Sequence, residues 1–276
     1  MKSILRQLFD EKIYNINNLT PRQIKEIVEL FDELGKNSLK KSYRQKEIII
    51  NTRLKKAFHK FVRDGDKEFV PIIKSYNYNQ LKPKLRKELE KATVEALSRI
   101  KTNDMAFLNK VKDNLLGYVS NVKLKKKIGG YYDAVLPRKY NQAWHDMVLR
   151  DQTHKLISNL TYITAIENSA IGFIWKHRHD IRVVGNPNGL YPKGNALHNN
   201  HWERDGRLYL FRDSQALKKG HIKKTDKVEW ADEIEDGIAG QPINCRCTMR
   251  IIFRLYEIPK EYKDMITAKG WETMKR

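Results

Sequence analysis

The segment Ile243-Asn-Cys-Arg-Cys-Thr-Met-Arg-Ile-Ile-Phe253 alternates apolar and polar residues. Because successive side chains of a strand point to opposite faces, this period of two predicts a strand with one buried face. That face would carry Ile243, Cys245, Cys247, Met249, Ile251 and Phe253. Shorter apolar runs upstream predict further strands at residues 172–175, 181–184 and 207–211. Together these runs predict a small sheet in the C-terminal part of the chain.

Helical periodicity precedes this sheet. Thr20-Pro21-Arg22-Gln23 is a capping box with proline at the first helical position, and it opens a helix that Gly35 is expected to end. Apolar residues at helical spacing predict further helices over residues 38–62, from Pro83 to about 100, from Asn103 to about 118 and over 140–169. The sequence thus predicts the α+β class, with an N-terminal helical domain followed by a small α+β domain whose short sheet is mainly antiparallel.

Breaks in these patterns divide the chain into four parts. They are a basic helical domain (1–118), a basic, glycine-containing linker (119–140), an α+β domain (141–256) and a tail or short helix (257–276). Within the α+β domain, residues 185–206 are rich in glycine, proline and asparagine, which predicts a long structured loop.

The charge of the chain favours a polyanionic partner. Among 276 residues, 54 Lys and Arg outnumber 33 Asp and Glu, so the formal net charge is +21. Residues 1–150 hold 33 of the basic and 17 of the acidic residues. We expect double-stranded DNA, bound without sequence specificity, as the partner; a merely solvated surface is the alternative. The densest basic run, which predicts a loop that contacts phosphates, contains Lys123, Lys125, Lys126 and Lys127.

The composition also excludes several classes of protein. Two cysteines in a chain of this length are too few for a secreted protein whose fold depends on several disulfides. No uninterrupted apolar stretch has the length of a signal peptide or a membrane span, so we expect no membrane partner. A nucleotide-binding glycine loop and a nucleophile elbow are both absent from the sequence.

Two groups of residues resemble a metal site, His198-Asn-Asn-His201 and Cys245-Arg-Cys247. Two histidines and two cysteines can supply the four ligands of structural zinc. However, residues two apart on a regular strand are about 6.5–7 Å apart, whereas thiolates that share a zinc ion are about 3.8 Å apart. Cys245 would therefore have to lie in a turn or a bulge. The simpler prediction is that both cysteines are small buried apolar residues and that no cofactor is bound.

Several motifs in a fixed order give Arg150–Cys247 a resemblance to a known family. They are Arg150-Asp-Gln-Thr153, Phe173-Ile-Trp175, Asp180-Ile-Arg-Val183, Gly185-Asn-Pro-Asn-Gly-Leu-Tyr-Pro192, His198 and His201 before Arg204-Asp-Gly206, and Gly240-Gln-Pro-Ile-Asn-Cys-Arg-Cys247. Their order resembles the phage Mu F-like minor head proteins, also called phage head morphogenesis proteins, over about residues 141–256. The resemblance marks eleven structural-motif residues: Arg182, Gly185, Asn186, Pro187, Gly189, His198, His201, Asn244, Cys245, Arg246 and Cys247.

The resemblance implies a non-enzymatic minor capsid protein of a tailed bacteriophage. Such a protein is made in the host cytoplasm and ends in the virion, inside the capsid or at the portal vertex. It would act in head assembly and in DNA packaging or delivery. Its expected partners are the portal protein and DNA, with the major capsid or scaffolding protein as a further possibility. Arg182 and Arg246 are candidate clamps for the loop, because a guanidinium can bind several backbone carbonyls.

Two other functions remain open from the sequence. One is a metal-dependent nuclease or phage-delivered effector that uses His198, His201 and Asp205, since histidine can activate water while a metal holds phosphate. The other is a host DNA-binding protein, which explains the charge but not the Gly-Asn-Pro and Asn-Cys-Arg-Cys motifs.

Overall fold

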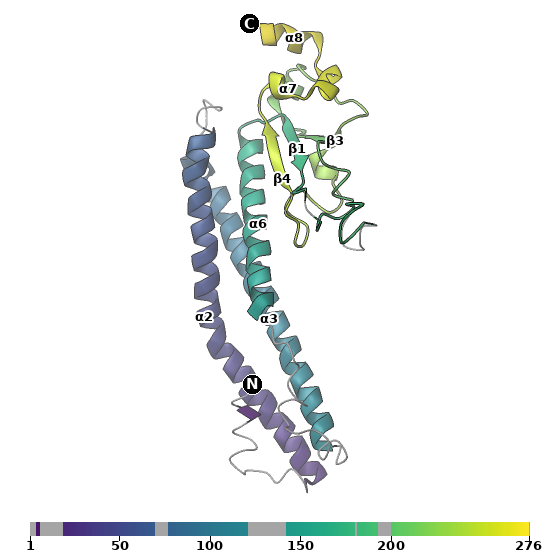
Figure 1. Cartoon of the computed structure of the whole chain (residues 1–276). Helices are drawn as coiled ribbons and strands as arrows, with labels where there is room; N and C mark the ends of the chain where they lie inside the picture. The colour runs from purple at the N-terminus through teal and green to yellow at the C-terminus, as the bar shows by residue number, and fades with distance from the viewer. Residues whose placement is uncertain are drawn as a thin grey trace. The chain divides into compact units, whose positions relative to one another are not determined.

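The computed structural model describes residues 4–5, 19–69, 77–120, 142–179, 181–192 and 200–275 (Figure 1). Its α-helices are α2 (Pro21–Phe69), α3 (Tyr78–Ser120), α6 (Gln142–Glu167), α7 (Gln215–Lys218) and α8 (Ala268–Lys275). The strands are β1 (Gly172–Lys176), β2 (Leu208–Leu210), β3 (Glu229–Trp230) and β4 (Thr248–Ile252). Short 3-10 helices are η2 (Ala231–Glu233), η3 (Leu255–Glu257) and η4 (Lys260–Met265). The chain is an α+β protein, as the sequence predicts.

The chain forms two compact units. One consists of Met1–Thr52 and Val94–Val148, and the other of Arg53–Thr93 and Leu149–Arg276. Both units combine segments from the helical range and from the α+β range that the sequence predicts. The folding of residues 1–118 and 141–256 as separate domains stays a prediction.

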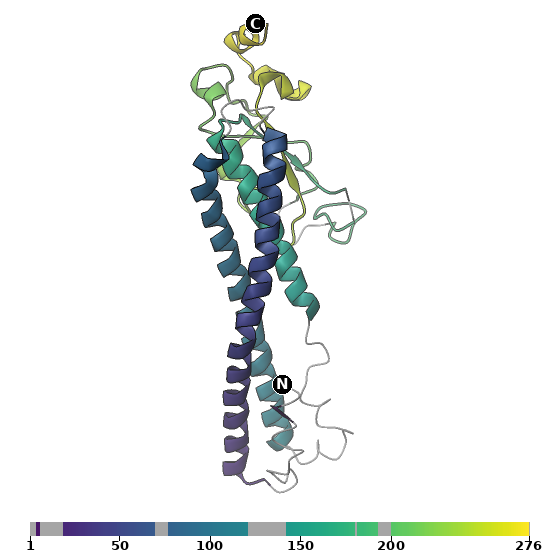
Figure 2. The same ribbon diagram turned by 90° about the vertical axis from the view of Figure 1, so that its left-hand side faces the viewer.

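In the first unit, α2 and α3 lie side by side (Figure 2). Their shared core includes Ile27, Phe31, Leu39, Leu108, Val111 and Leu115. The prediction that Gly35 ends a helix is wrong, because α2 continues through it. A Cβ on Gly35 would lie 2.4 Å from Leu108 Cδ1, so the missing side chain makes room for α3. This glycine therefore serves the close approach of two helices.

The predicted break at Asn103 is also wrong, since α3 is one continuous helix that includes Pro83 near its start. Asp104, which follows Asn103, is fully buried and forms an ion pair with Lys46 of α2. Its other carboxylate oxygen lies 3.2 Å from His145 Nε2. The polar residues at this point thus mark a buried polar contact between helices of the first unit.

The second unit contains a four-stranded sheet in the order β3-β2-β1-β4. The central strand β1 pairs antiparallel with β2 and β4, and β3 pairs parallel with β2. This confirms the predicted strands at 172–175 and 207–211 and a mainly antiparallel sheet; the two-residue strand β3 was not predicted. The helix predicted over 140–169 is confirmed as α6, which lies along the sheet (Figure 1).

The two faces of the sheet pack against different segments. Phe173 and Trp175 contact the side of α6 that carries Ala165. Ile174, between them, packs on the opposite side with Met265. This alternation is that of a strand covered on both faces. The C-terminal residues therefore belong to the core of the second unit, and of the two predicted forms of the segment 257–276 they adopt short helices.

Two strand predictions need correction. Residues 181–184 form turns, because their backbone bonds inside their own loop: Leu190 N–H donates to Ile181 O at 2.6 Å. The strand predicted from 243 to 253 is β4 alone, which begins at Thr248. Before it, Cys245 N–H donates to Pro242 O at 3.0 Å, and Asn244 has the left-handed φ of 58°. Ile243 is exposed as a result, while both cysteines are buried.

Candidate functional site

Three irregular segments of the second unit meet beside Trp175, near the end of β1. They are the turn that begins with His201, the turn at Asp236 and the segment Cys245–Cys247. The indole ring of Trp175 is fully buried and contacts the His201 ring edge-on, with centroids 5.2 Å apart. We call the five residues His201, Arg204, Asp236, Cys245 and Cys247 the His-Cys centre.

His201 lies in the middle of the His-Cys centre. Its Nε2 is 3.0 Å from Asp236 Oδ2. On the other side of the ring, Nδ1 is 3.6 Å from Cys245 Sγ and 3.8 Å from Cys247 Sγ. The side chain of His201 is only 4% exposed, so this ring is enclosed by its partners.

The carboxylate of Asp236 is held from two sides. Arg204 Nη1 donates to Asp236 Oδ1 at 2.6 Å, and the Arg204 guanidinium lies 4.9 Å from the centroid of the Trp175 ring. Burial alone would raise the pKa of Asp236, but the hydrogen bonds from His201 and Arg204 outweigh it and hold that pKa well below its usual range. Asp236 is therefore an anion in the folded protein.

The same contacts shift the pKa of His201 and of both thiols. Burial would lower the pKa of His201, but hydrogen bonds to Asp236 and Cys245 raise it to about 9. Hydrogen bonds from Cys247 and His201 lower the pKa of Cys245. The hydrogen bond to Cys245 and burial raise the pKa of Cys247. The centre thus favours a thiolate beside an imidazolium, with the second sulfur as a donor.

Helix α6 fixes the position of the cysteine segment. Asp151 Oδ1 accepts a hydrogen bond of 2.6 Å from Asn244 N–H, and Asp151 Oδ2 lies 3.2 Å from Lys155 Nζ. Asp151 and Lys155 thus form an ordinary ion pair at i,i+4 spacing on one helix face. His154 Nε2 lies 3.0 Å from Cys247 O, one helical turn further along. These side chains of α6 hold a segment that has no strand partner of its own.

The Gly-Asn-Pro loop next to the centre is a compact turn. Gly185 has a φ of +86°, and a Cβ there would lie 1.8 Å from Asn200 Oδ1. Asn186 is buried, and its Oδ1 accepts a hydrogen bond of 3.0 Å from Asn188 N–H. Pro187 is exposed and Gly189 half-buried. The structured loop predicted here is confirmed over residues 185–192, and residues 193–199 lie outside the described ranges.

The structure brings together four of the predicted site residues: His201, Asn244, Cys245 and Cys247. Arg182 and Arg246 lie at exposed positions, so their role as loop clamps stays a prediction. His198 and the DNA-contacting residues Lys123, Lys125, Lys126 and Lys127 lie outside the described residues. Sequence analysis missed Asp236. The dipeptide Asp236-Gly237 indicates only a turn, and nothing in the sequence links it to His201, 35 positions away.

A second group of possible metal ligands lies close by, in His177, His179 and Asp205. Asp205 Oδ1 accepts from His177 N–H at 3.0 Å, and the His177 ring stacks on Trp202 with centroids 4.5 Å apart. His177 Nδ1 already accepts from His179 N–H at 2.9 Å. His179 itself is exposed. Local hydrogen bonds therefore already use part of this group, and only His179 is exposed.

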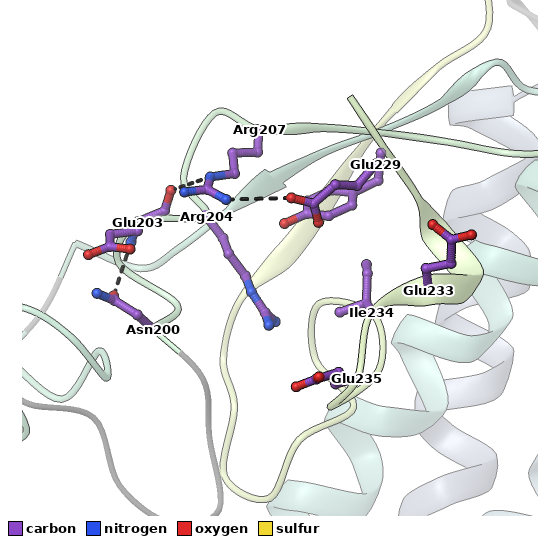
Figure 3. Close-up of a pocket in the computed structure, with 9 residues that line it drawn as sticks. Asn200, Glu203, Arg204, Arg207, Glu229, Glu233, Ile234 and Glu235 are labelled. Atoms are coloured by element: carbon purple, nitrogen blue, oxygen red, sulfur yellow. Dashed lines mark hydrogen bonds and ion pairs between the residues drawn. The ribbon is translucent and has the colours of Figure 1, made fainter. Parts of the chain in front are cut away.

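An acidic pocket of about 280 Å³ lies next to the His-Cys centre (Figure 3). Its lining includes four glutamates and two arginines: Glu203, Glu229, Glu233, Glu235, Arg204 and Arg207. Arg207 Nε donates to Glu203 O at 2.8 Å, and Arg207 Nη1 lies 3.6 Å from Glu229 Oε1. With Arg204 paired to Asp236, the pocket has a surplus of negative charge, which disfavours phosphate groups.

Comparison with known protein families, curated proteins and solved structures found no match to this chain. The family resemblance therefore rests on the motifs. In the described part of the chain, no helix has both the length and the apolar character that crossing a bilayer requires.

Proposed function

We propose that the chain is a minor head protein of a tailed bacteriophage, which acts in head assembly by associating with the portal and with packaged DNA. The observation that carries the proposal is that the motifs of the family resemblance meet at one place. Asp151 from the first motif contacts Asn244 from the last, 93 positions away. His201, from the motif between them, contacts both cysteines. These contacts give the separate motifs one shared structural role, which explains why they occur together in one chain.

The basic excess supports the DNA part of the proposal. Along α2, exposed basic residues follow one another: Lys40, Lys41, Arg44, Arg53, Lys55, Lys56, Lys60 and Arg63. Exposed cations of this density attract a polyanion and release its counterions on binding, without reading sequence. The acidic pocket of the second unit does not share this property, so we assign DNA contacts to the basic helical segments and to the lysines at 123–127.

The proposed role is non-enzymatic. Both ring nitrogens of His201 are engaged within the His-Cys centre, and its side chain is 4% exposed. A histidine in this position does not reach a phosphodiester or an attacking water. As far as it uses His201, the nuclease alternative gains no support from this geometry; His198, its other histidine, lies outside the described residues.

The decisive experiment is quantitative mass spectrometry of density-purified, DNA-filled particles from the source of this sequence. We expect a few copies per portal ring, located in the capsid interior or at the portal vertex. Absence from particles, with the protein abundant in the lysate, would overturn the proposal. Plasmid incubated with the protein and Mg²⁺, Mn²⁺ or Zn²⁺ should stay intact; cleavage would favour the nuclease.

The DNA part is tested separately by filter binding over a range of salt concentrations. Two charge-matched variants are compared, each with four lysines changed to glutamine. One changes Lys123, Lys125, Lys126 and Lys127; the control changes the exposed lysines Lys218, Lys219, Lys223 and Lys224. Each lost phosphate contact lowers the slope of log affinity against log salt by about 0.9. We expect a lower slope in the first variant only. An equal slope in both would contradict the assigned contact.

A further inference from the structure

We propose that Cys245, Cys247 and His201 bind one structural zinc ion through the two sulfurs and His201 Nδ1. This inference does not depend on the proposed function. The alternating sequence predicts both cysteines on a regular strand, and that geometry disfavours zinc. In the structure both precede β4, and the two sulfurs and a ring nitrogen of His201 lie within 4.8 Å of one another.

The distances between the donor atoms fit a tetrahedral ion. With Zn–S near 2.3 Å and Zn–N near 2.0–2.1 Å, tetrahedral angles put sulfur and nitrogen ligands about 3.6 Å apart. The observed separations from His201 Nδ1 are 3.6 Å to Cys245 Sγ and 3.8 Å to Cys247 Sγ. Both sulfur–nitrogen separations therefore fit a zinc ion, and the sulfur–sulfur separation lies within 4.8 Å, against the 3.8 Å or so that shared coordination requires. These donors leave one position of the tetrahedron for a fourth ligand.

The surroundings of the three donors are those of a metal site. A zinc-bound histidine usually donates its second ring N–H to a carboxylate, which fixes the orientation of the ring. Asp236 lies at that position, 3.0 Å from His201 Nε2, and Arg204 holds the carboxylate in place. Cys247 N–H donates to Cys245 Sγ at 3.4 Å, which stabilises a thiolate there.

The second sulfur, Cys247 Sγ, has a possible hydrogen-bond donor in Trp175. The indole Nε1 of Trp175 is buried and has no hydrogen-bond partner among the described residues. Trp175 and Cys247 belong to the same buried cluster. A thiolate bound to zinc would satisfy this N–H, whereas a neutral thiol is a weak acceptor.

Charge balance supports zinc in this buried position. Two thiolates and a neutral imidazole offset the two positive charges of Zn²⁺, and Asp236 offsets Arg204. Both cysteines and His201 are buried, so an uncompensated charge here would be costly. The group of His177, His179 and Asp205 fits less well. It has no soft ligand, and His177 Nδ1 is already used by a backbone N–H.

The first test uses the full-length wild-type protein, purified under reducing conditions. We expect elemental analysis to find one zinc per chain. Neither thiol should react with a thiol reagent until a chelator removes the metal, and both should react afterwards. Replacing zinc by Co²⁺ should give the strong visible bands of a tetrahedral site and a thiolate charge-transfer band.

Three results would each overturn the proposal. Thiols that react without a chelator show that no ion protects them. Thiols that react only after a reductant show a disulfide between Cys245 and Cys247. Thiols that react only after denaturation, in protein without metal, show simple burial.

Variants then locate the ion. Cys245→Ser and Cys247→Ser should each lose zinc, and Co²⁺ forced onto either variant at high concentration should show the charge-transfer intensity of one thiolate only. Asp236→Asn should keep the stoichiometry but weaken affinity by about 10–100-fold, because it removes only the support of the histidine. The control is His179→Asn, since asparagine tolerates the φ of 51° found there. It should bind zinc normally; zinc lost in this variant and kept in the cysteine variants would assign the ion to the other group.

Discussion

The link between Asp151 and Asn244 makes a quantitative prediction about the stability of the second unit. The Asp151 side chain is 5% exposed and joins α6 to the cysteine segment through a hydrogen bond of 2.6 Å to Asn244 N–H. We expect Asp151→Ala to lower the free energy of unfolding of this unit, because the variant leaves a backbone donor without its partner.

The magnitude follows from three contributions. A hydrogen bond to a charged group contributes about 1.5–3 kcal/mol. The ion pair with Lys155 adds at least about 0.3–0.5 kcal/mol, the value for exposed pairs at i,i+4 spacing, because both side chains are largely buried. Alanine is a better helix former than aspartate by about 0.6 kcal/mol, which offsets the ion pair. The net loss for Asp151→Ala is therefore about 2 kcal/mol. Asp151→Asn keeps an acceptor without charge and should lose about 1 kcal/mol.

Urea unfolding followed by tryptophan fluorescence measures this loss. Four of the five tryptophans lie in the second unit, so the signal reports mainly on it: Trp175, Trp202, Trp230 and Trp271. The control is Arg150→Ala, which changes an exposed residue of the same helix and the same unit and should change stability by less than about 0.5 kcal/mol. If Asp151→Ala and Arg150→Ala unfold at the same urea concentration, the contact with Asn244 does not hold the cysteine segment.

Two further predictions concern the first unit. Gly35→Val should destabilise it by about 1–3 kcal/mol, because any Cβ there meets Leu108; Gly117→Ala, where a Cβ meets nothing within 4 Å, should stabilise it by about 0.5–1 kcal/mol. Equal urea midpoints for the two variants would contradict the close helix approach. The hydrogen bond from Lys36 lowers the pKa of Asp32 below its ordinary value of 3.8, so Asp32 stabilises the fold above that pH and loses this effect as the pH falls. Asp32→Asn should therefore flatten the decline of the midpoint below about pH 4; an unchanged slope would refute the pairing.

Local patterns predicted the elements whose burial follows one period. Helix α6 is an example, because its apolar residues recur at the helical spacing of the face that it buries. Strand β1 was predicted from an uninterrupted apolar run, which fits a strand that is covered on both faces. The ends of helices were predicted less well. Glycine is typical of a helix end, but at Gly35 it has another cause: α3 packs so closely there that no side chain fits. Asp104 has the polarity of a helix start, yet Lys46, 58 positions away, explains its burial.

The His-Cys centre, too, depends on contacts between distant residues that local patterns do not reveal. Sequence analysis selected His201 and both cysteines by residue type, but it assumed the geometry of a strand for the segment that contains them. The left-handed Asn244 and its bond to Asp151 break that geometry, and neither can be inferred from the alternation itself. Asp236 was not predicted because its partner, His201, is brought next to it by the fold and does not share a local motif with it.

Within the proposed function, the distribution of charge on the described residues suits two different partners. The segments that carry the His-Cys centre have little regular structure, and their links are side-chain contacts to α6, to Trp175 and to one another. Beside them lies a pocket with a surplus of glutamates, which repels phosphate. A surface of this kind suits a protein partner, whereas the exposed cations of α2 suit DNA. Within the proposed function, portal contacts should therefore depend on the intact His-Cys centre and persist at salt concentrations that abolish retention on DNA. Loss of both at the same salt concentration would mean that a single basic surface accounts for both partners.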